Sequence, residues 1–194
     1  MKTLPITKKL IGTAEDYSFE ERLYHGMLVF MMGFTLLFTI IDIVGKLYMD
    51  IIPNFGVFLV VATLYYLARV KKRYFFFSLY LFLTLAATFF YLTNKGIYGG
   101  ATLSLLVILI LALAYTPVKR HIFILLIHLI VLGLIFTIQY RWPQLILDPY
   151  KTPHTLFITL AMITLVCVLM FFLIINFLKK SYENERKLGN QQKK

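Results

Sequence analysis

The feature that most constrains this chain is a series of six long apolar runs separated by short polar breaks. The runs cover approximately residues 24–47, 53–69, 74–93, 101–117, 119–140 and 153–178. A helix needs roughly 20 apolar residues to cross a bilayer, and 60% of this chain is hydrophobic, with a mean hydropathy of +0.79. These values exclude a soluble fold. We therefore expect an all-α, polytopic membrane protein with six transmembrane helices.

The basic residues predict the orientation of these helices. On one side, 16 of the 20 Lys and Arg residues lie before the first run, at 69–73, at 119–120 and after the sixth run. The other four are Lys46, Lys95, Arg141 and Lys151. Because connections rich in Lys and Arg stay in the cytoplasm, we expect both termini there and the protein in the inner (cytoplasmic) cell membrane.

Three parts of the chain follow from this pattern. Residues 1–17 are expected to form a mobile cytoplasmic tail, 18–178 the six-helix transmembrane bundle, and 179–194 a short cytoplasmic helical extension with a polar end. The spacing of Ser18 and Glu21 predicts a capping box at the start of the first helix. Asp50–Asn54 is expected to form an external turn, with Pro53 in the first turn of the second helix. Thr152 and Pro153 predict the start of the sixth helix.

Several function classes are disfavoured. The net charge of +11 lies in short groups at the ends of spans, where it meets anionic lipid head groups, and this is not the pattern of a nucleic-acid-binding face. Cys167 is the only cysteine, so an intrachain disulfide and a cysteine-based metal site are excluded. We find no catalytic motif and no pair of intramembrane carboxylates that could hold a metal or share a proton. The sequence thus predicts no enzyme, no cofactor and no metal site.

Polar residues inside apolar runs are candidate ligand or sensing positions, because they are costly in a membrane. Thr35, Thr39, Asp42 and Lys46 share one helical stripe, and Asp42 is the only acidic residue within an apolar run. Asp42 and Lys46 are either part of a ligand or proton site, or a local pair at the i, i+4 spacing.

A second stripe holds His121, His128 and Gln139. His128 lies near the middle of its run, where it serves either in sensing or as a neutral imidazole hydrogen-bonded between helices. The turn at 94–100 contains three glycines in seven residues, which permit a sharp reversal. Asn94 and Gly96 of this turn complete the set of ligand or sensing candidates.

Three stretches together resemble a known family. They are Phe19-Glu20-Glu21-Arg22-Leu23-Tyr24-His25 before the first run, Asn94-Lys95-Gly96-Ile97-Tyr98-Gly99-Gly100-Ala101-Thr102-Leu103 in the third external turn, and Ser181-Tyr182-Glu183-Asn184-Glu185-Arg186-Lys187 after the sixth run. The arrangement is similar to the N-terminal six-helix membrane sensor region of bacterial two-component sensor histidine kinases. Where Pro often follows Gly in that family's turn, this chain has Ala101 after Gly100. No phosphoacceptor-histidine or ATP-binding motif follows Leu188.

The resemblance implies a membrane signal sensor, acting as a homodimer, that passes a stimulus through the sixth helix to a cytoplasmic histidine kinase and its response regulator. The stimulus would act from outside or from within the bilayer, and the expected partners are the lipid bilayer and an unknown small ligand. The alternatives are a small six-span transporter or channel component, and a membrane scaffold that recruits partners through its basic tails.

Overall fold

The computed structural model describes residues 10–13, 16–45, 48–150 and 152–191, and these ranges contain helices and no strand. The expected all-α class is therefore confirmed. The long helices are α2 (Phe19–Gly45), α3 (Tyr48–Lys71), α4 (Phe76–Thr93), α5 (Ala101–Tyr115), α6 (His121–Arg141) and α7 (Pro153–Gln191). Three short 3₁₀ helices lie in the connections: η1 (Gly96–Tyr98), η2 (Val118–Arg120) and η3 (Pro143–Leu145).

Two predicted helix starts are confirmed by their capping hydrogen bonds. At α2, the Ser18 backbone N–H donates to Glu21 Oε2 over 2.8 Å, and the Glu21 N–H donates to Ser18 Oγ over 3.3 Å. At α7, the Thr155 N–H donates to Thr152 Oγ1 over 3.2 Å. These bonds satisfy backbone donors that have no partner inside the helix.

The start of α3 differs from the expected turn at Asp50–Asn54. The helix begins at Tyr48 and includes Pro53 as an internal residue. Pro53 lies only five residues after Tyr48, so its missing N–H removes one of the earliest bonds of the helix and leaves the later ones intact. As a result, Asp50 and Asn54 belong to a helix, and both side chains are buried.

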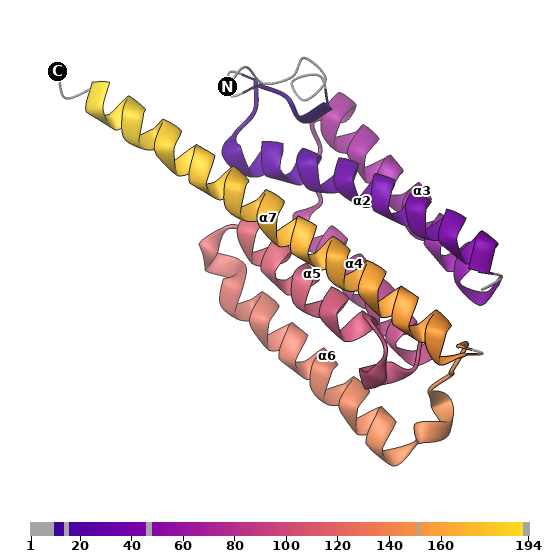
Figure 1. Ribbon diagram of the computed structural model, residues 1–194. Coiled ribbons are helices and arrows are strands. Elements are labelled where there is room, and N and C mark those ends of the chain that lie inside the picture. Colours follow the sequence, from indigo (N-terminus) through magenta and orange to yellow (C-terminus); the bar gives the residue numbers. More distant parts are fainter. Residues whose placement is uncertain (1–9, 14–15, 46–47, 151, 192–194) are drawn as a thin grey trace.

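The six long helices form two groups. α2 pairs with α3, and α4 pairs with α5, while α6 packs along the outside of the α4–α5 pair. α7 crosses the molecule diagonally, packing against α5 and touching α2 (Figure 1). The α2–α3 pair thus meets α4, α5 and α7 along a seam.

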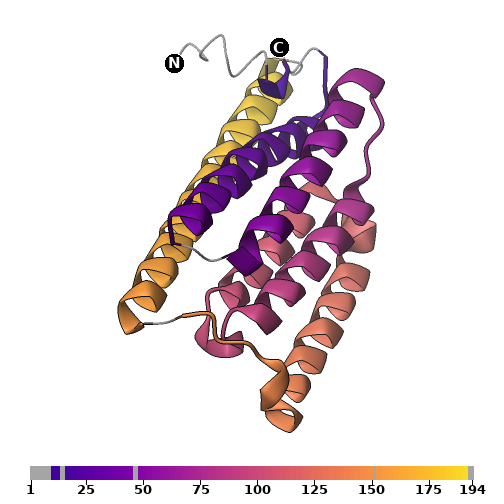
Figure 2. The ribbon, with the colours of Figure 1, turned by 90° about the vertical axis from the view of Figure 1, so that its right-hand side faces the viewer.

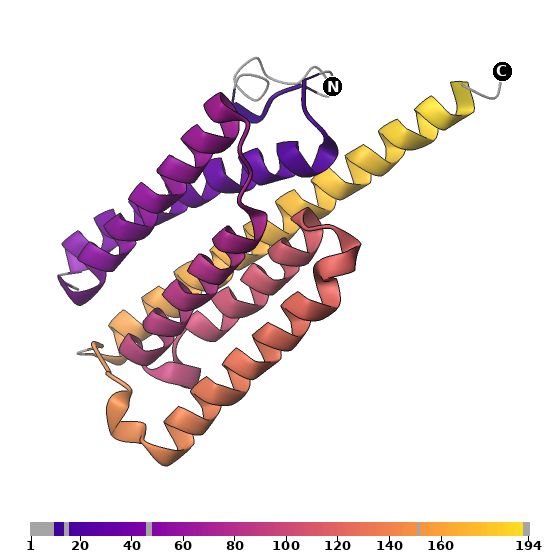
Figure 3. The same ribbon diagram turned by 180° about the vertical axis from the view of Figure 1, so that it is seen from behind.

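The helix ends are distributed over two ends of the molecule. The start of α2, the 72–75 and 116–120 connections and the end of α7 lie at one end (Figures 1 and 2). We call the other one the η1 end; it holds the end of α2, the start of α3, the η1 turn and the η3 loop, as the reverse view in Figure 3 also shows. This up-and-down order places the basic 72–75 and 116–120 connections at one end of the molecule, and their cytoplasmic location stays a prediction.

Four helical segments are long and apolar enough to cross a membrane. They are Glu20–Ile40, Asp50–Lys71, Phe76–Thr93 and Val118–Arg141, each 18–24 residues long. Among the described residues, the apolar helices Ala101–Tyr115 and Pro153–Leu169 are shorter. The membrane character of the chain is thus supported by four helices, and the count of six spans stays a prediction.

Candidate functional site

A cavity of about 160 Å³ lies in the seam between the α2–α3 pair and the α4, α5 and α7 helices. Most of its wall is apolar, and this part includes Met31, Phe34, Phe38, Leu83, Phe90 and Met162. Hydroxyl groups come from Thr35, Ser104 and Thr159, and the charged, amide and phenol groups gather toward the η1 end: Asp42, Asp50, Asn54, Asn94 and Tyr150. The cavity therefore has an apolar body and a polar end.

Asp42 belongs to this polar end through a contact between α2 and α3. Asn54 Nδ2 donates a hydrogen bond to Asp42 Oδ2 over 2.6 Å, and both residues are buried. Thr35 and Thr39, on the same stripe of α2, are buried as well, and each donates to a carbonyl of its own helix. Lys46, the fourth residue of the predicted stripe, lies outside the described residues.

Asn94 connects Asp50 with Tyr150. Its Nδ2 donates to Asp50 Oδ1 over 3.2 Å, and its Oδ1 accepts from the Tyr150 hydroxyl over 3.0 Å. Asn94 follows the last residue of α4 and is buried. The candidate residue Asn94 thus joins α3, α4 and the loop before α7 at a single point.

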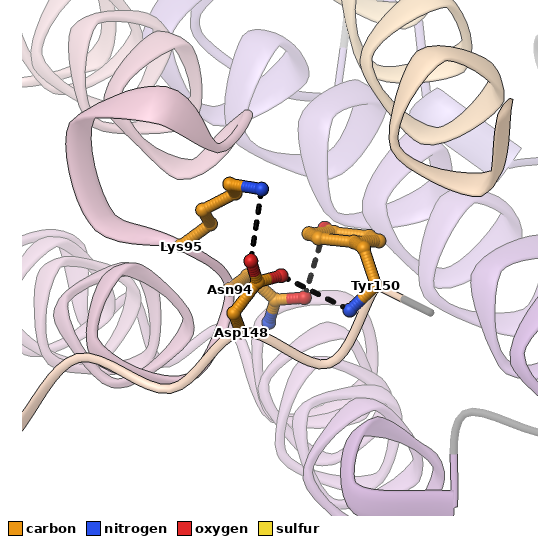
Figure 4. Close-up of polar contacts among 4 residues, drawn as sticks. All are labelled: Asn94, Lys95, Asp148 and Tyr150. Atoms are coloured by element: carbon orange, nitrogen blue, oxygen red, sulfur yellow. Dashed lines mark hydrogen bonds and ion pairs between the residues drawn. The ribbon is translucent and has the colours of Figure 1, made fainter. Parts of the chain in front are cut away.

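The loop that carries Tyr150 is attached to the η1 turn (Figure 4). Lys95 Nζ lies 2.8 Å from Asp148 Oδ2, and the Tyr150 N–H donates to Asp148 Oδ1 over 3.1 Å. Two backbone bonds of 2.8 Å, from Lys95 N to Leu147 O and from Leu147 N to Leu92 O, complete the attachment. Hydrogen bonding to Lys95 lowers the pKa of the exposed Asp148 carboxyl.

Tyr150 lies in a negative environment. Burial raises the pKa of its hydroxyl to about 12, and the nearby carboxylates of Asp50, Asp148 and Asp42 add to this rise. The hydroxyl therefore stays protonated at neutral pH and acts as the hydrogen-bond donor to Asn94.

Gly96 and Gln139 lie together, next to Asn94 but outside the cavity wall. Gly96 has a φ of +58°, and a Cβ at this position would collide with the Gln139 side chain. Gln139 Oε1 accepts from the Ile97 N–H over 3.0 Å and from the Tyr91 hydroxyl. These contacts fix the η1 turn against α4 and α6. Gly96 and Gln139 thus support the position of the neighbouring Asn94, which lines the cavity.

His128 lies apart from the cavity, between α6 and α4. It is fully buried, and its Nδ1 lies 3.4 Å from the Tyr80 hydroxyl, which donates to the Ile124 carbonyl over 3.1 Å. This geometry is of the interhelical kind that the sequence left as one of two alternatives. The structure therefore brings Asp42 and Asn94 together, with Gly96 and Gln139 beside them, and leaves His128 out.

A buried histidine at the opposite end had no predicted role. His25 Nδ1 lies 3.0 Å from the Ile11 carbonyl, and the Tyr17 ring meets the His25 ring edge-on at 4.9 Å. The Arg69 guanidinium lies 4.7 Å from the centre of the Tyr17 ring. The described part of the 1–17 segment thus packs against the start of α2 and the end of α3, and the predicted mobility of this segment stays a prediction.

Sequence reasoning did not select Asp50, Asn54 and Tyr150 as candidate residues, although all three line the cavity together with Asp42. Asp50 begins the span Asp50–Lys71 and lines the same cavity as Asp42. It was assigned to a turn because the polar residues at 50 and 54 interrupt the apolar pattern.

The chemistry of this polar end is acceptance of hydrogen bonds and of positive charge. Among the described residues, no group of three His, Cys, Asp or Glu side chains is arranged to hold a metal ion. Its two carboxylates, two amides and phenol can accept and donate hydrogen bonds.

In comparisons with known proteins, no family model, no curated protein and no solved structure matches this chain.

Proposed function

We propose that this chain is the membrane-embedded sensing region of a signal receptor, with the cavity as its ligand site and α7 as its output. The observation that carries the proposal is the course of α7. Ile158, Thr159, Met162 and Ile163 of this helix line the cavity, and the same helix continues without interruption to Gln191. A change in how the cavity is packed therefore acts directly on an element that leaves the bundle.

The length of α7 supports a role in transmission. Helix α7 extends 28 residues beyond Ile163, which is about 42 Å at a rise of about 1.5 Å per residue. A ligand can shift α7 between two positions only by its difference in affinity for the two packings of the bundle. The seam between the α2–α3 pair and α7 is where such packings would differ.

The proposal includes the finer topology. All six long helices cross the inner cell membrane, both termini lie in the cytoplasm, and the η1 end faces outward. Two copies pair through α7. Their cytoplasmic ends pass the signal to a histidine kinase, as the resemblance of the chain implies.

A phase experiment tests the output role of α7. Residues 1–188 are joined in register to the catalytic module of a histidine kinase, and one to four residues are inserted after Lys187. Each inserted helical residue rotates the attached module by about 100°, so kinase activity should rise and fall with the inserted length. A matched series with the same number of flexible Gly-Ser residues should abolish the dependence on phase. Equal activity across the helical series, in folded and inserted protein, would contradict the proposal.

A small transporter is the second candidate, and one observation favours it. Asp42 and Asp50 are buried carboxylates in a cavity between two helix groups, and intramembrane carboxylates are common in proton-coupled transport. Uptake of a labelled substrate into vesicles that contain the chain alone would favour this candidate. A phase-dependent kinase chimera without such uptake would favour the receptor.

A further inference from the structure

At the polar end of the cavity, carboxylate oxygens of Asp42 and Asp50 can accept further hydrogen bonds. Asp42 is 4% exposed and Asp50 is 5% exposed. Asp42 Oδ2 accepts from Asn54 and Asp50 Oδ1 accepts from Asn94, while Asp42 Oδ1 and Asp50 Oδ2 accept from no described residue. Each acid thus has one carboxylate oxygen without a partner among the described residues, and both acids line the cavity.

Within the part of the chain that the structure describes, no Lys or Arg side chain lines the cavity. Across the described ranges, an ion pair forms between Lys95 and Asp148, and it lies in the exposed loop. Lys46 and Lys151 are close to this end in the sequence and lie outside the described residues. A buried carboxylate without a counter-charge is costly, so a cation that enters the cavity would be stabilised by Asp42 and Asp50.

The rest of the cavity selects the body of the ligand. Its wall contains the rings of Phe34, Phe38 and Phe90 and the side chains of Met31 and Met162. A volume of about 160 Å³ is close to that of the roughly 150 Å³ cavity known to hold a benzene molecule. Aromatic faces additionally attract a cation. The space fits about one ring with a small charged group.

We propose that the cavity binds a small organic monocation with an apolar body, its ammonium group at the Asp42–Asp50 end and its body against Phe34, Phe38 and Phe90. Asn54 and Asn94 hold the two carboxylates in place, and the Tyr150 loop covers them. This inference rests on the proposed function for its role in signalling, and it names the chemical class of the ligand.

A pair of probes of the same shape tests the proposal. The full chain is placed in nanodiscs of uncharged phosphatidylcholine, and binding of benzylammonium and of benzyl alcohol is measured by saturation-transfer difference NMR against empty nanodiscs. The two probes differ in charge and share their ring. Benzylammonium should bind at least about tenfold more tightly, because its charge-assisted hydrogen bonds are the stronger ones. Equal affinities, or no benzylammonium signal above that of empty nanodiscs, would overturn the proposal.

Two variants locate the preference. Asp42→Asn and Asp50→Asn keep an oxygen to accept from Asn54 and Asn94, and each should reduce benzylammonium affinity by about tenfold without changing that of benzyl alcohol. Glu20→Gln removes one negative charge from an exposed residue at the opposite end of α2 and should leave both affinities unchanged. A charge preference that persists in both aspartate variants would overturn the assignment. Circular dichroism verifies that each variant is folded.

Binding and signalling can fail separately. A cation preference together with a flat phase series would remove the receptor proposal and leave the ligand class. A phase-dependent chimera without a cation preference would do the reverse.

Discussion

Single residues decide the shape of the turn beside the cavity. Gly96 has its backbone in the left-handed region and lies against Gln139, which in turn holds Ile97 and Tyr91. Gly96 therefore combines a conformation that other residues rarely adopt with a contact that leaves no room for a Cβ. Asn94, the bridge between Asp50 and Tyr150, lies two residues earlier.

Gly96→Ala should destabilise the protein by about 1–2 kcal/mol, because this is the cost of left-handed backbone for an L-residue. Displacement of Gln139 adds to this cost. The measurement is thermal unfolding of the purified chain, followed by circular dichroism. Gly133→Ala is the matched control, since a Cβ on Gly133 meets nothing within 4 Å and alanine favours a helix by up to about 1 kcal/mol. Equal melting temperatures for the two variants would contradict the role of Gly96.

At the scale of helices, local signals in the sequence were enough to place most boundaries. Ser18 with Glu21, and Thr152 with Pro153, mark the starts of α2 and α7 through bonds made within three residues. The glycines at 96–100 mark the reversal between α4 and α5. Such signals can be recognised in a sequence because the capping or turn residue lies within a few positions of the helix end that it determines.

The contacts at the polar end of the cavity could not be predicted from such local signals. The Asn54–Asp42 bond joins residues 12 positions apart, Asn94–Asp50 joins residues 44 apart, and Tyr150–Asn94 joins residues 56 apart. A stripe pattern identifies a face of one helix and does not name the residues that the face will meet. Asp42 and Asn94 could therefore be selected as candidates, while their partners Asp50, Asn54 and Tyr150 required the structure.

The proposed pairing of two copies through α7 leads to a prediction about its C-terminal part. We expect single cysteines at 178–188, in a Cys167→Ala background, to form intermolecular disulfides with a maximum every three to four residues. This period follows from 3.6 residues per helical turn if two copies pair along one face of α7. Cross-linked dimer is measured on non-reducing gels of membranes that contain the full chain.

A cysteine in place of Ile130, an exposed residue of α6, measures the background yield of disulfides that form by random collision in the membrane. Yields at 178–188 that are uniform and equal to this background would contradict pairing through α7.

At the scale of the whole molecule, the distribution of basic residues along the sequence can be compared with the directions of the helices in the structure. Basic residues concentrate at alternate connections, and the helices run alternately up and down, so these connections lie at the same end as the end of α7 (Figures 1 and 3). Neither the charge distribution nor the helix directions determine the number of membrane crossings, because α5 and the described apolar part of α7 are short. The count of six crossings therefore stays a prediction.

Reporter fusions test this topology. We expect a fusion after Lys194 to be active as a cytoplasmic reporter and inactive as a periplasmic one, and a sandwich fusion within 94–100 to behave in the opposite way. The physical reason is that flanking Lys and Arg residues are retained in the cytoplasm. A fusion in the 72–75 connection is the control and should match the one at Lys194. The same sidedness at Lys194 and at 94–100 would contradict the six-span arrangement.

The shortness of α5 has a consequence for the surrounding lipid. Its 15 residues span about 22 Å at a rise of about 1.5 Å per residue, whereas the hydrocarbon layer is about 30 Å thick. In the proposed topology, this hydrophobic mismatch sinks the η1 turn below the head groups or thins the bilayer around it. Irregular backbone survives at that depth only when protein covers it, and the bonds of Leu147 to Lys95 and Leu92 provide such cover. The two carboxylates would thus lie at the bottom of a recess in the outer leaflet, with only a short path between them and water.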